Sequence, residues 1–193
     1  MKAYSINGTP LFFWGVLFFL GLIWGSSFYA VSISLSNYEP MQIASARIAI
    51  GALALTLLSF KYGDGLPSFS KGKRKIWFYS FGMGAFTNGI PFSLLSWAQT
   101  EVSSSFAGVA MSFVPFITLT LAHYLVRGQR LSFLKVLGLI IGFLGMLILF
   151  DVSNIYSQWT ENNGWRFKLA CFGAAACYSI GSIITRRSPS ISQ

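Results

Sequence analysis

The stretch EPMQIASARIAIGALALTLLSF, residues 39–60, is apolar and long enough to cross a membrane, yet it contains an arginine, Arg47. A membrane-spanning helix needs about 20 predominantly apolar residues. Arg47 lies about 9 Å into the predicted helix, in the outer third of a hydrocarbon core that is about 30 Å thick. An arginine at the centre of such a helix costs about 2.5–3.5 kcal/mol. The guanidinium of Arg47 therefore needs either partners or aqueous surroundings.

The composition of the whole chain is that of a membrane protein. Of its 193 residues, 54% are hydrophobic and only 10% are charged, whereas soluble domains usually carry about 25% charged residues. Apolar runs of membrane-spanning length recur along the chain. We expect six transmembrane helices, at about 11–35, 41–60, 76–98, 102–126, 132–150 and 166–185. The sequence therefore predicts an all-α, polytopic integral membrane protein that lies in a lipid bilayer.

Lysine and arginine are distributed unequally between the two sides of these helices. One side collects Lys2, Lys61, Lys71, Lys73, Arg74, Lys75, Arg127, Arg130, Lys135, Arg186 and Arg187. The opposite side has only Arg166 and Lys168, together with most of the acids, which are Glu39, Glu101, Asp151 and Glu161. Because cytoplasmic loops carry the excess of basic residues, both chain termini are predicted to be cytoplasmic.

Several classes of function find no support in the residues. The net charge of +9 comes from helix ends and not from a basic stripe with aromatics, so no nucleic-acid partner is expected. Cys171 and Cys177 lie in one apolar segment and predict buried thiols, with no metal site or disulfide. No phosphate loop of the GxxxxGK type and no catalytic cluster is present, and His123 lies near a helix end. We expect no enzyme activity, no ATP-driven step and no cofactor.

Arg47 itself leaves two interpretations open. In the first it is a structural clamp across the external helix ends, with Glu101 and Asp151 as partners at the same level. In the second it faces a central aqueous cavity and attracts anionic groups, as ionisable residues inside membrane proteins commonly do.

Two neighbouring helices are predicted to be interrupted within the membrane. The first contains FTNGIPFSLLSWAQ, residues 86–99, in which Pro91 removes a backbone donor next to Gly89 and Asn88 adds an amide. The second has Pro115 near its middle. Opened backbone at that depth is tolerated only where protein or water satisfies it, and in transporters it commonly builds the substrate site. We expect a cavity here, lined also by the deep aromatics Trp24 and Trp97.

Small residues and an internal similarity describe how the helices are organised. Gly21 with Gly25, and Gly138 with Gly142, form GxxxG motifs that predict tight helix packing. Residues 170–187 can be laid on residues 18–34, with Tyr178 matching Trp24. An offset of five helices turns the second copy upside down, as in the inverted repeats of many transporters. We therefore divide the chain into a five-helix repeat, 1–155, and the first helix of a second repeat, 156–193.

Residues 23–58 and 103–150 resemble the EamA-like family of the drug/metabolite transporter superfamily. The matching features are Trp24-Gly25-Ser26, Pro40 followed by Arg47, Pro115, and the turn RGQRLS leading to Gly138, Gly142 and Gly145. The resemblance implies two inverted five-helix repeats, ten helices in all, around a central cavity in the plasma (bacterial inner) membrane. It also implies transport of small organic solutes without ATP. The family usually has an acidic residue at the position of Gln129 in this chain. Whether this chain keeps the ion pair that such a carboxylate would form is therefore in question.

The resemblance and the residues together give the predicted site and function. The predicted substrate-binding residues are Trp24, Arg47, Asn88, Trp97 and Pro115. The predicted function is that of a secondary transporter, an exporter of small organic metabolites or drugs. By the family's plan half of the cavity is missing, so either the chain is truncated, which its abrupt end favours, or a homodimer supplies the remaining walls. The alternative is a non-transporting membrane subunit or an inactive remnant of such a transporter, and a membrane enzyme would need polar clusters that the sequence lacks.

Overall fold

The computed structural model describes residues 11–63, 65–69, 74–126, 128–129, 131–149 and 164–188, and these form helices and their connections. The elements are α1 (Leu11–Ser34), α2 (Pro40–Tyr62), α3 (Arg74–Gly84), a π-helix (Ala85–Gly89), α4 (Ile90–Ala98), α5 (Ser104–Met111), α6 (Val114–Leu125), α7 (Phe133–Leu149) and α9 (Trp165–Arg187). The six predicted helices are therefore present, the third in three pieces and the fourth in two. The predicted fold class, an all-helical polytopic membrane protein, is confirmed.

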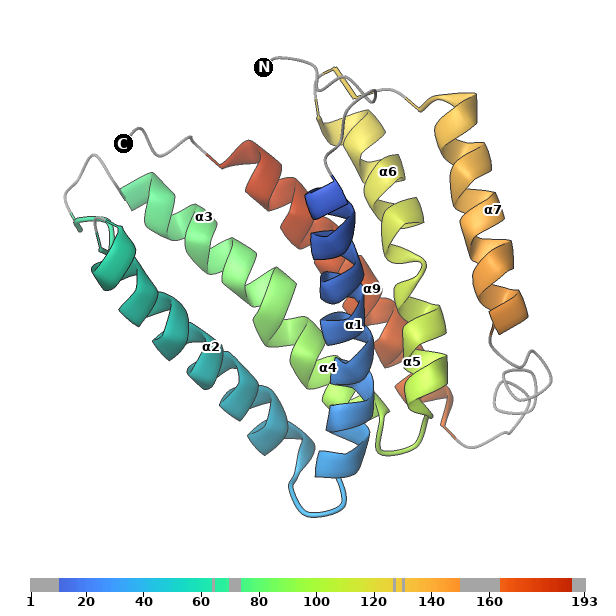
Figure 1. Ribbon diagram of the computed structural model, residues 1–193, viewed down its shortest axis with the longest axis horizontal. Helices are drawn as coiled ribbons and strands as arrows, with labels where there is room; N and C mark the ends of the chain where they lie inside the picture. Colours follow the sequence, from blue (N-terminus) through green and yellow to red (C-terminus); the bar gives the residue numbers. More distant parts are fainter. Residues whose placement is uncertain are drawn as a thin grey trace.

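Among the described residues, four helical segments are long and apolar enough to cross a membrane: α1, α2, the α5–α6 pair and α9. The helix α7 is apolar but shorter, and the π-helix divides the third segment. Successive segments run in opposite directions (Figure 1), so the connections gather at two ends. One end carries the described basic residues Lys61, Arg74, Lys75, Lys135, Arg186 and Arg187. We call it the basic end, and it groups these residues as the sequence predicted.

The third segment is interrupted where the sequence predicted. The backbone N–H of Ile90 donates to the carbonyl of Ala85, five residues back, which is the wider turn of a π-helix. Pro91 has no N–H to offer to the preceding turn, so the backbone widens there and α4 begins anew. The hydroxyl of Ser93 donates to the carbonyl of Gly89 at 2.9 Å. A π-bulge of this kind often marks a functional site.

The fourth segment is also interrupted at its predicted position. The helix α5 ends at Met111, a turn follows at Ser112 and Phe113, and α6 begins with Pro115 in its first turn. Proline is favoured at the start of a helix, where its missing N–H has no partner to lose. The α5–α6 pair is thus two short helices in line.

The helix α9 packs against α3, the π-helix, α4, α5 and α6, and it supplies much of the buried surface. Most of its buried residues have small side chains. A Cβ placed on Gly181 would lie 2.5 Å from Thr87 Oγ1 and 3.2 Å from two backbone atoms of the π-helix. The buried hydroxyl of Ser179 donates to the carbonyls of Ala175, at 2.9 Å, and Val114, at 3.2 Å. The face of α9 therefore touches both interrupted segments.

The predicted GxxxG packing is wrong within the described residues. A Cβ added at Gly21 or Gly25 of α1, or at Gly138 or Gly142 of α7, would meet nothing within 4 Å. The physical reason is that both helices pack little against the rest of the chain: α7 lies at the edge of the helix array, and α1 lies in front of it (Figure 1). Within the chain, α1 packs mainly against α5.

Candidate functional site

Arg47 is half-buried and is held by residues from two other helices. Its Nη2 donates a hydrogen bond of 2.7 Å to Ser27 Oγ of α1. Its Cζ lies 4.1 Å from the centroid of the Phe92 ring in α4. Ser27 and Arg47 each lie about two turns from the short α1–α2 connection, so the two side chains meet at one depth. A cation over an aromatic face is attracted by the ring quadrupole.

A fourth residue joins this group from α9. The rings of Phe92 and Tyr178 have centroids 6.4 Å apart, tilted by 53°. The phenol of Tyr178 lies within electrostatic range of the Arg47 guanidinium. We call Ser27, Arg47, Phe92 and Tyr178 the Arg47 cluster. It draws on α1, α2, α4 and α9 and so connects the last described helix to the first two.

The positive charge of Arg47 has no carboxylate partner among the described residues. Glu101, one of the two acids predicted to pair with it, is exposed in the turn between α4 and α5. Asp151, the other, lies outside the described residues. A guanidinium has five N–H donors, and Ser27 accepts from one nitrogen. The cluster can therefore bind a further acceptor, and the unbalanced charge favours an anionic one.

The two interrupted segments contain buried polar atoms that have no hydrogen-bond partner in the described part of the chain. They are Nε1 of Trp77, Oγ1 of Thr87, Oγ of Ser96 and both amide atoms of Gln99 in the third segment, and Oγ1 of Thr118 in the fourth. A buried polar group costs free energy unless it is hydrogen-bonded. These side chains are therefore suited to hold water or a polar solute beside the interrupted helices.

The other four predicted site residues are not among the side chains that contact Arg47. Trp24 is 65% exposed on α1, Asn88 is exposed on the π-helix, and Pro115 is exposed in the first turn of α6. Trp97 packs on the ring of Phe167, with centroids 4.6 Å apart. No described hydrogen bond or ring contact joins these four to Arg47. Their roles in substrate binding remain predictions.

Three members of the Arg47 cluster were not among the predicted site residues. Tyr178 had a signal in the sequence, because it matched Trp24 when the last helix was laid on the first. Ser27 and Phe92 had none, because a serine among small residues and a phenylalanine in an apolar helix are ordinary in a membrane span. Only the folded arrangement of the helices brings them to the guanidinium.

The chain is similar to a known family and to several transporters. The EamA-like transporter family matches residues 12–151. An uncharacterized transporter of Archaeoglobus fulgidus is 32% identical over 145 residues, which are 74% of this chain and 50% of the relative. The uncharacterized inner membrane transporter YedA of Escherichia coli (strain K12) is 27% identical over 180 residues, 92% of this chain and 54% of the relative. No solved structure is matched.

Two facts follow from these comparisons. The chain spans about half the length of the curated relatives that it matches. The family match covers the helices from α1 to α7, including both interrupted segments and Arg47. With its apolar helices and its similarity to membrane transporters, the chain is a membrane protein, and it belongs to the EamA-like transporter family.

Proposed function

We propose that the chain acts in secondary transport, as an exporter of small organic metabolites or drugs across the plasma membrane, with Arg47 on the substrate path. The observation that carries this proposal is the half-buried guanidinium of Arg47, which lies inside a membrane span without a carboxylate partner among the described residues. Such a residue costs free energy in a membrane, and binding an anionic or polar solute would offset that cost.

The interrupted segments support the same proposal. Transporter binding sites are commonly formed by interrupted helices with unsatisfied polar atoms. Here Thr87 and Thr118 supply such atoms from the two interrupted segments that α9 contacts. The sequence contains no GxxxxGK phosphate loop, so transport is proposed to use an existing gradient instead of ATP.

The wider architecture belongs to the proposal as well. Residues 1–155 would form one five-helix repeat and residues 156–193 would begin an inverted second one, in a ten-helix plan with both termini cytoplasmic. Alternatively, a second copy of this chain would supply the remaining walls of the central cavity. The packing of α9 against the interrupted segments, and not at the edge, is consistent with a helix that borders a central cavity.

Transport by the whole gene product in proteoliposomes tests this function. We would load the vesicles with radiolabelled amino acids, nucleosides and organic acids, and with the cationic dye ethidium, and measure release under an imposed proton or sodium gradient. Arg47→Gln should reduce the release by about tenfold or more, as expected for one charge-assisted hydrogen bond. Arg47→Lys should retain part of it. Arg166→Gln is the matched control, because Arg166 is exposed and its one contact among the described residues is with the ring of Trp165, whose centroid lies 5.6 Å from Cζ.

Thermal unfolding in detergent separates a site residue from a structural clamp. If Arg47 serves transport, Arg47→Gln should lose transport while its melting temperature stays equal to that of the native protein or rises, because an unpaired cation is removed from the membrane. A lowered melting temperature together with proportionally less folded protein would identify Arg47 as a clamp. Absence of release for every probe in the native protein would favour the non-transporting remnant.

A further inference from the structure

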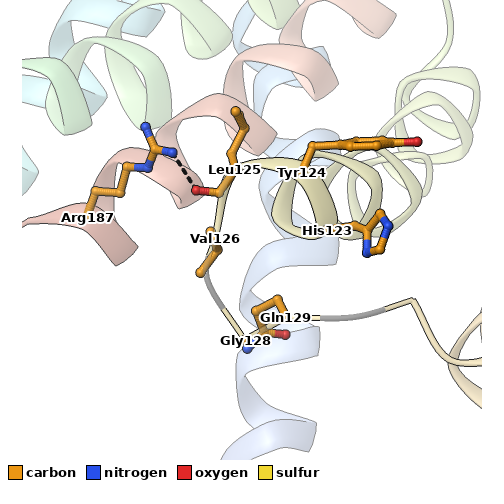
Figure 2. A pocket seen from close by; sticks show the side chains of 7 residues that line it. All are labelled: His123, Tyr124, Leu125, Val126, Gly128, Gln129 and Arg187. Carbon is orange, nitrogen blue, oxygen red and sulfur yellow. Dashed lines mark hydrogen bonds between the residues drawn. The ribbon is translucent and has the colours of Figure 1, made fainter.

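Two cavities meet at Arg187 on the basic end of the molecule. The first has a volume of about 460 Å³ and lies between the end of α6, the turn that follows it and the last turn of α9. Figure 2 shows its lining residues, which are His123, Tyr124, Leu125, Val126, Gly128, Gln129 and Arg187. No carboxylate is among them. We call it the polar pocket.

The polar pocket presents hydrogen-bond donors that the fold holds in place. A guanidinium nitrogen of Arg187 donates to the carbonyl of Leu125 at the C-terminal end of α6 (Figure 2), which fixes the cation and leaves its other N–H groups available. The backbone N–H of Leu131 donates to Nδ1 of His123 at 3.3 Å. Because Nδ1 of His123 accepts this hydrogen bond, Nε2 is the ring nitrogen that can serve as a second donor. Arginine is the side chain best suited to bind a phosphate oxygen pair.

The second cavity is apolar and lies deeper in the membrane-spanning region. It has a volume of about 420 Å³ and is lined by Phe78, Tyr79, Gly82, Phe86, Leu121, Leu125, Ile180, Ile183, Ile184 and Arg187. We call it the apolar groove. It shares Leu125 and Arg187 with the polar pocket. From Arg187 to Ile180 it follows α9 for about two turns, or about 10 Å, which is the depth of the first part of an acyl chain.

The charge of this end is complementary to an anion. The described charged residues there are Lys61, Arg74, Lys75, Lys135, Arg186 and Arg187. Asp64, the one acid of these connections in the sequence, lies outside the described residues. Basic pockets between transmembrane helices at a membrane surface bind anionic lipid headgroups.

We propose that the polar pocket and the apolar groove together bind one anionic phospholipid from the leaflet at the basic end. Its phosphate lies against Arg187 and His123, and one acyl chain enters the groove between α3, α6 and α9. A lipid fits because the change from polar to apolar lining falls at the end of α6 and α9, where headgroups give way to hydrocarbon. A free anion would leave the groove unfilled, and an apolar peptide would leave Arg187 without a counter-charge.

Native mass spectrometry of the whole chain in detergent tests the headgroup half of the proposal. Phosphatidylglycerol and phosphatidylcholine with identical acyl chains would be titrated in parallel. The native protein should retain phosphatidylglycerol about tenfold more tightly. Arg187→Gln should abolish that preference, whereas Arg186→Gln, on the same turn but outside both cavities, should weaken it by less than about threefold. Equal losses for the two variants would mean that general surface charge attracts the lipid, and would overturn the proposed site.

A second pair of variants tests the acyl-chain half without changing any charge. A Cβ at Gly82 would lie 3.7 Å from Ile184 Cδ1, so Gly82→Leu places its side chain in the apolar groove. Gly84→Leu is the matched control, because a Cβ at Gly84 meets nothing within 4 Å and Gly84 is not part of the lining. Gly82→Leu should reduce phosphatidylglycerol retention several-fold and Gly84→Leu should not. Thermal unfolding of both variants verifies that they remain folded.

Three results would overturn the proposal. Inorganic phosphate that displaces the lipid at equal concentration would show an anion site without a lipid tail. Equal retention of phosphatidylcholine would show that the headgroup charge is not recognised. A doubled mass that Gly82→Leu reduces to the mass of one chain would show that a second copy covers the groove.

Discussion

The first and last helices are both apolar membrane spans, yet they occupy opposite environments. Of the apolar window that marks each span, 6% is buried within the chain in α1 and 44% in α9. The more hydrophobic of the two, α1, is therefore the less buried. The helix α9 packs among the other helices, whereas α1 lies in front of the array (Figure 1).

The difference shows that hydrophobicity and burial are separate properties in a membrane. Large apolar side chains match the lipid as well as they match protein, so they do not draw a helix into the interior. Small side chains favour burial of a helix, because they let two helix backbones approach closely enough to make dispersion contacts. In α9 the buried positions include Ala174, Ala175, Ser179 and Gly181, whereas in α1 the buried hydrophobic residue among those described is Val31.

In this comparison, the largest effect on stability is expected when a glycine in each of the two helices is replaced by alanine. Gly181→Ala should destabilise the fold by about 1–3 kcal/mol, because its Cβ would crowd Thr87 Oγ1 and force α9 away from the π-helix. Gly25→Ala in α1 should be neutral or slightly stabilising, because nothing lies within 4 Å of the added atom. Reversible unfolding in detergent would compare the two. Equal effects would mean that α9 is no more tightly packed than α1.

A smaller effect is expected for serine to alanine in the same two helices. The Ser179 hydroxyl bonds both within α9 and across to the Val114 carbonyl of α6. Ser179→Ala should cost about 1 kcal/mol, the usual size for a hydrogen bond between membrane helices. Among the described residues, the Ser34 hydroxyl donates to the carbonyl of Ala30 within α1, at 2.8 Å, and to no other helix, so Ser34→Ala should leave the unfolding free energy unchanged. A large loss in Ser34→Ala would contradict the peripheral position of α1.

The helices and their breaks could be predicted from the sequence because local chemistry decides them. The length of each apolar run predicts a membrane span. Pro91 lacks an N–H, so its helix is interrupted there whatever other helices it packs against. The same holds for Pro115 at the start of α6. The distribution of lysine and arginine groups the described basic residues at one end, because successive helical segments run in opposite directions.

The contacts of the candidate site could not be predicted, because they depend on how the helices rotate and tilt against one another. Arg47 stands out in any reading of the sequence, but its partners Ser27 and Phe92 are separated from it by 20 and 45 positions and carry no signal of their own. Glycine pairs were misleading for a related reason. Gly21 and Gly25 would permit another helix to approach closely, but their spacing does not predict which helix will do so.

Labelling of single cysteines in intact cells tests the central claim most directly, which is that α9 returns the chain to the end where α2 finishes. With Cys171 and Cys177 replaced by alanine, a membrane-impermeant maleimide would be applied to the variants Tyr62→Cys, Arg186→Cys, Asn37→Cys and Thr100→Cys. We expect Asn37→Cys and Thr100→Cys to react in intact cells, and Tyr62→Cys and Arg186→Cys to react only after permeabilisation. Reaction of Tyr62→Cys and Arg186→Cys from opposite sides would contradict the account.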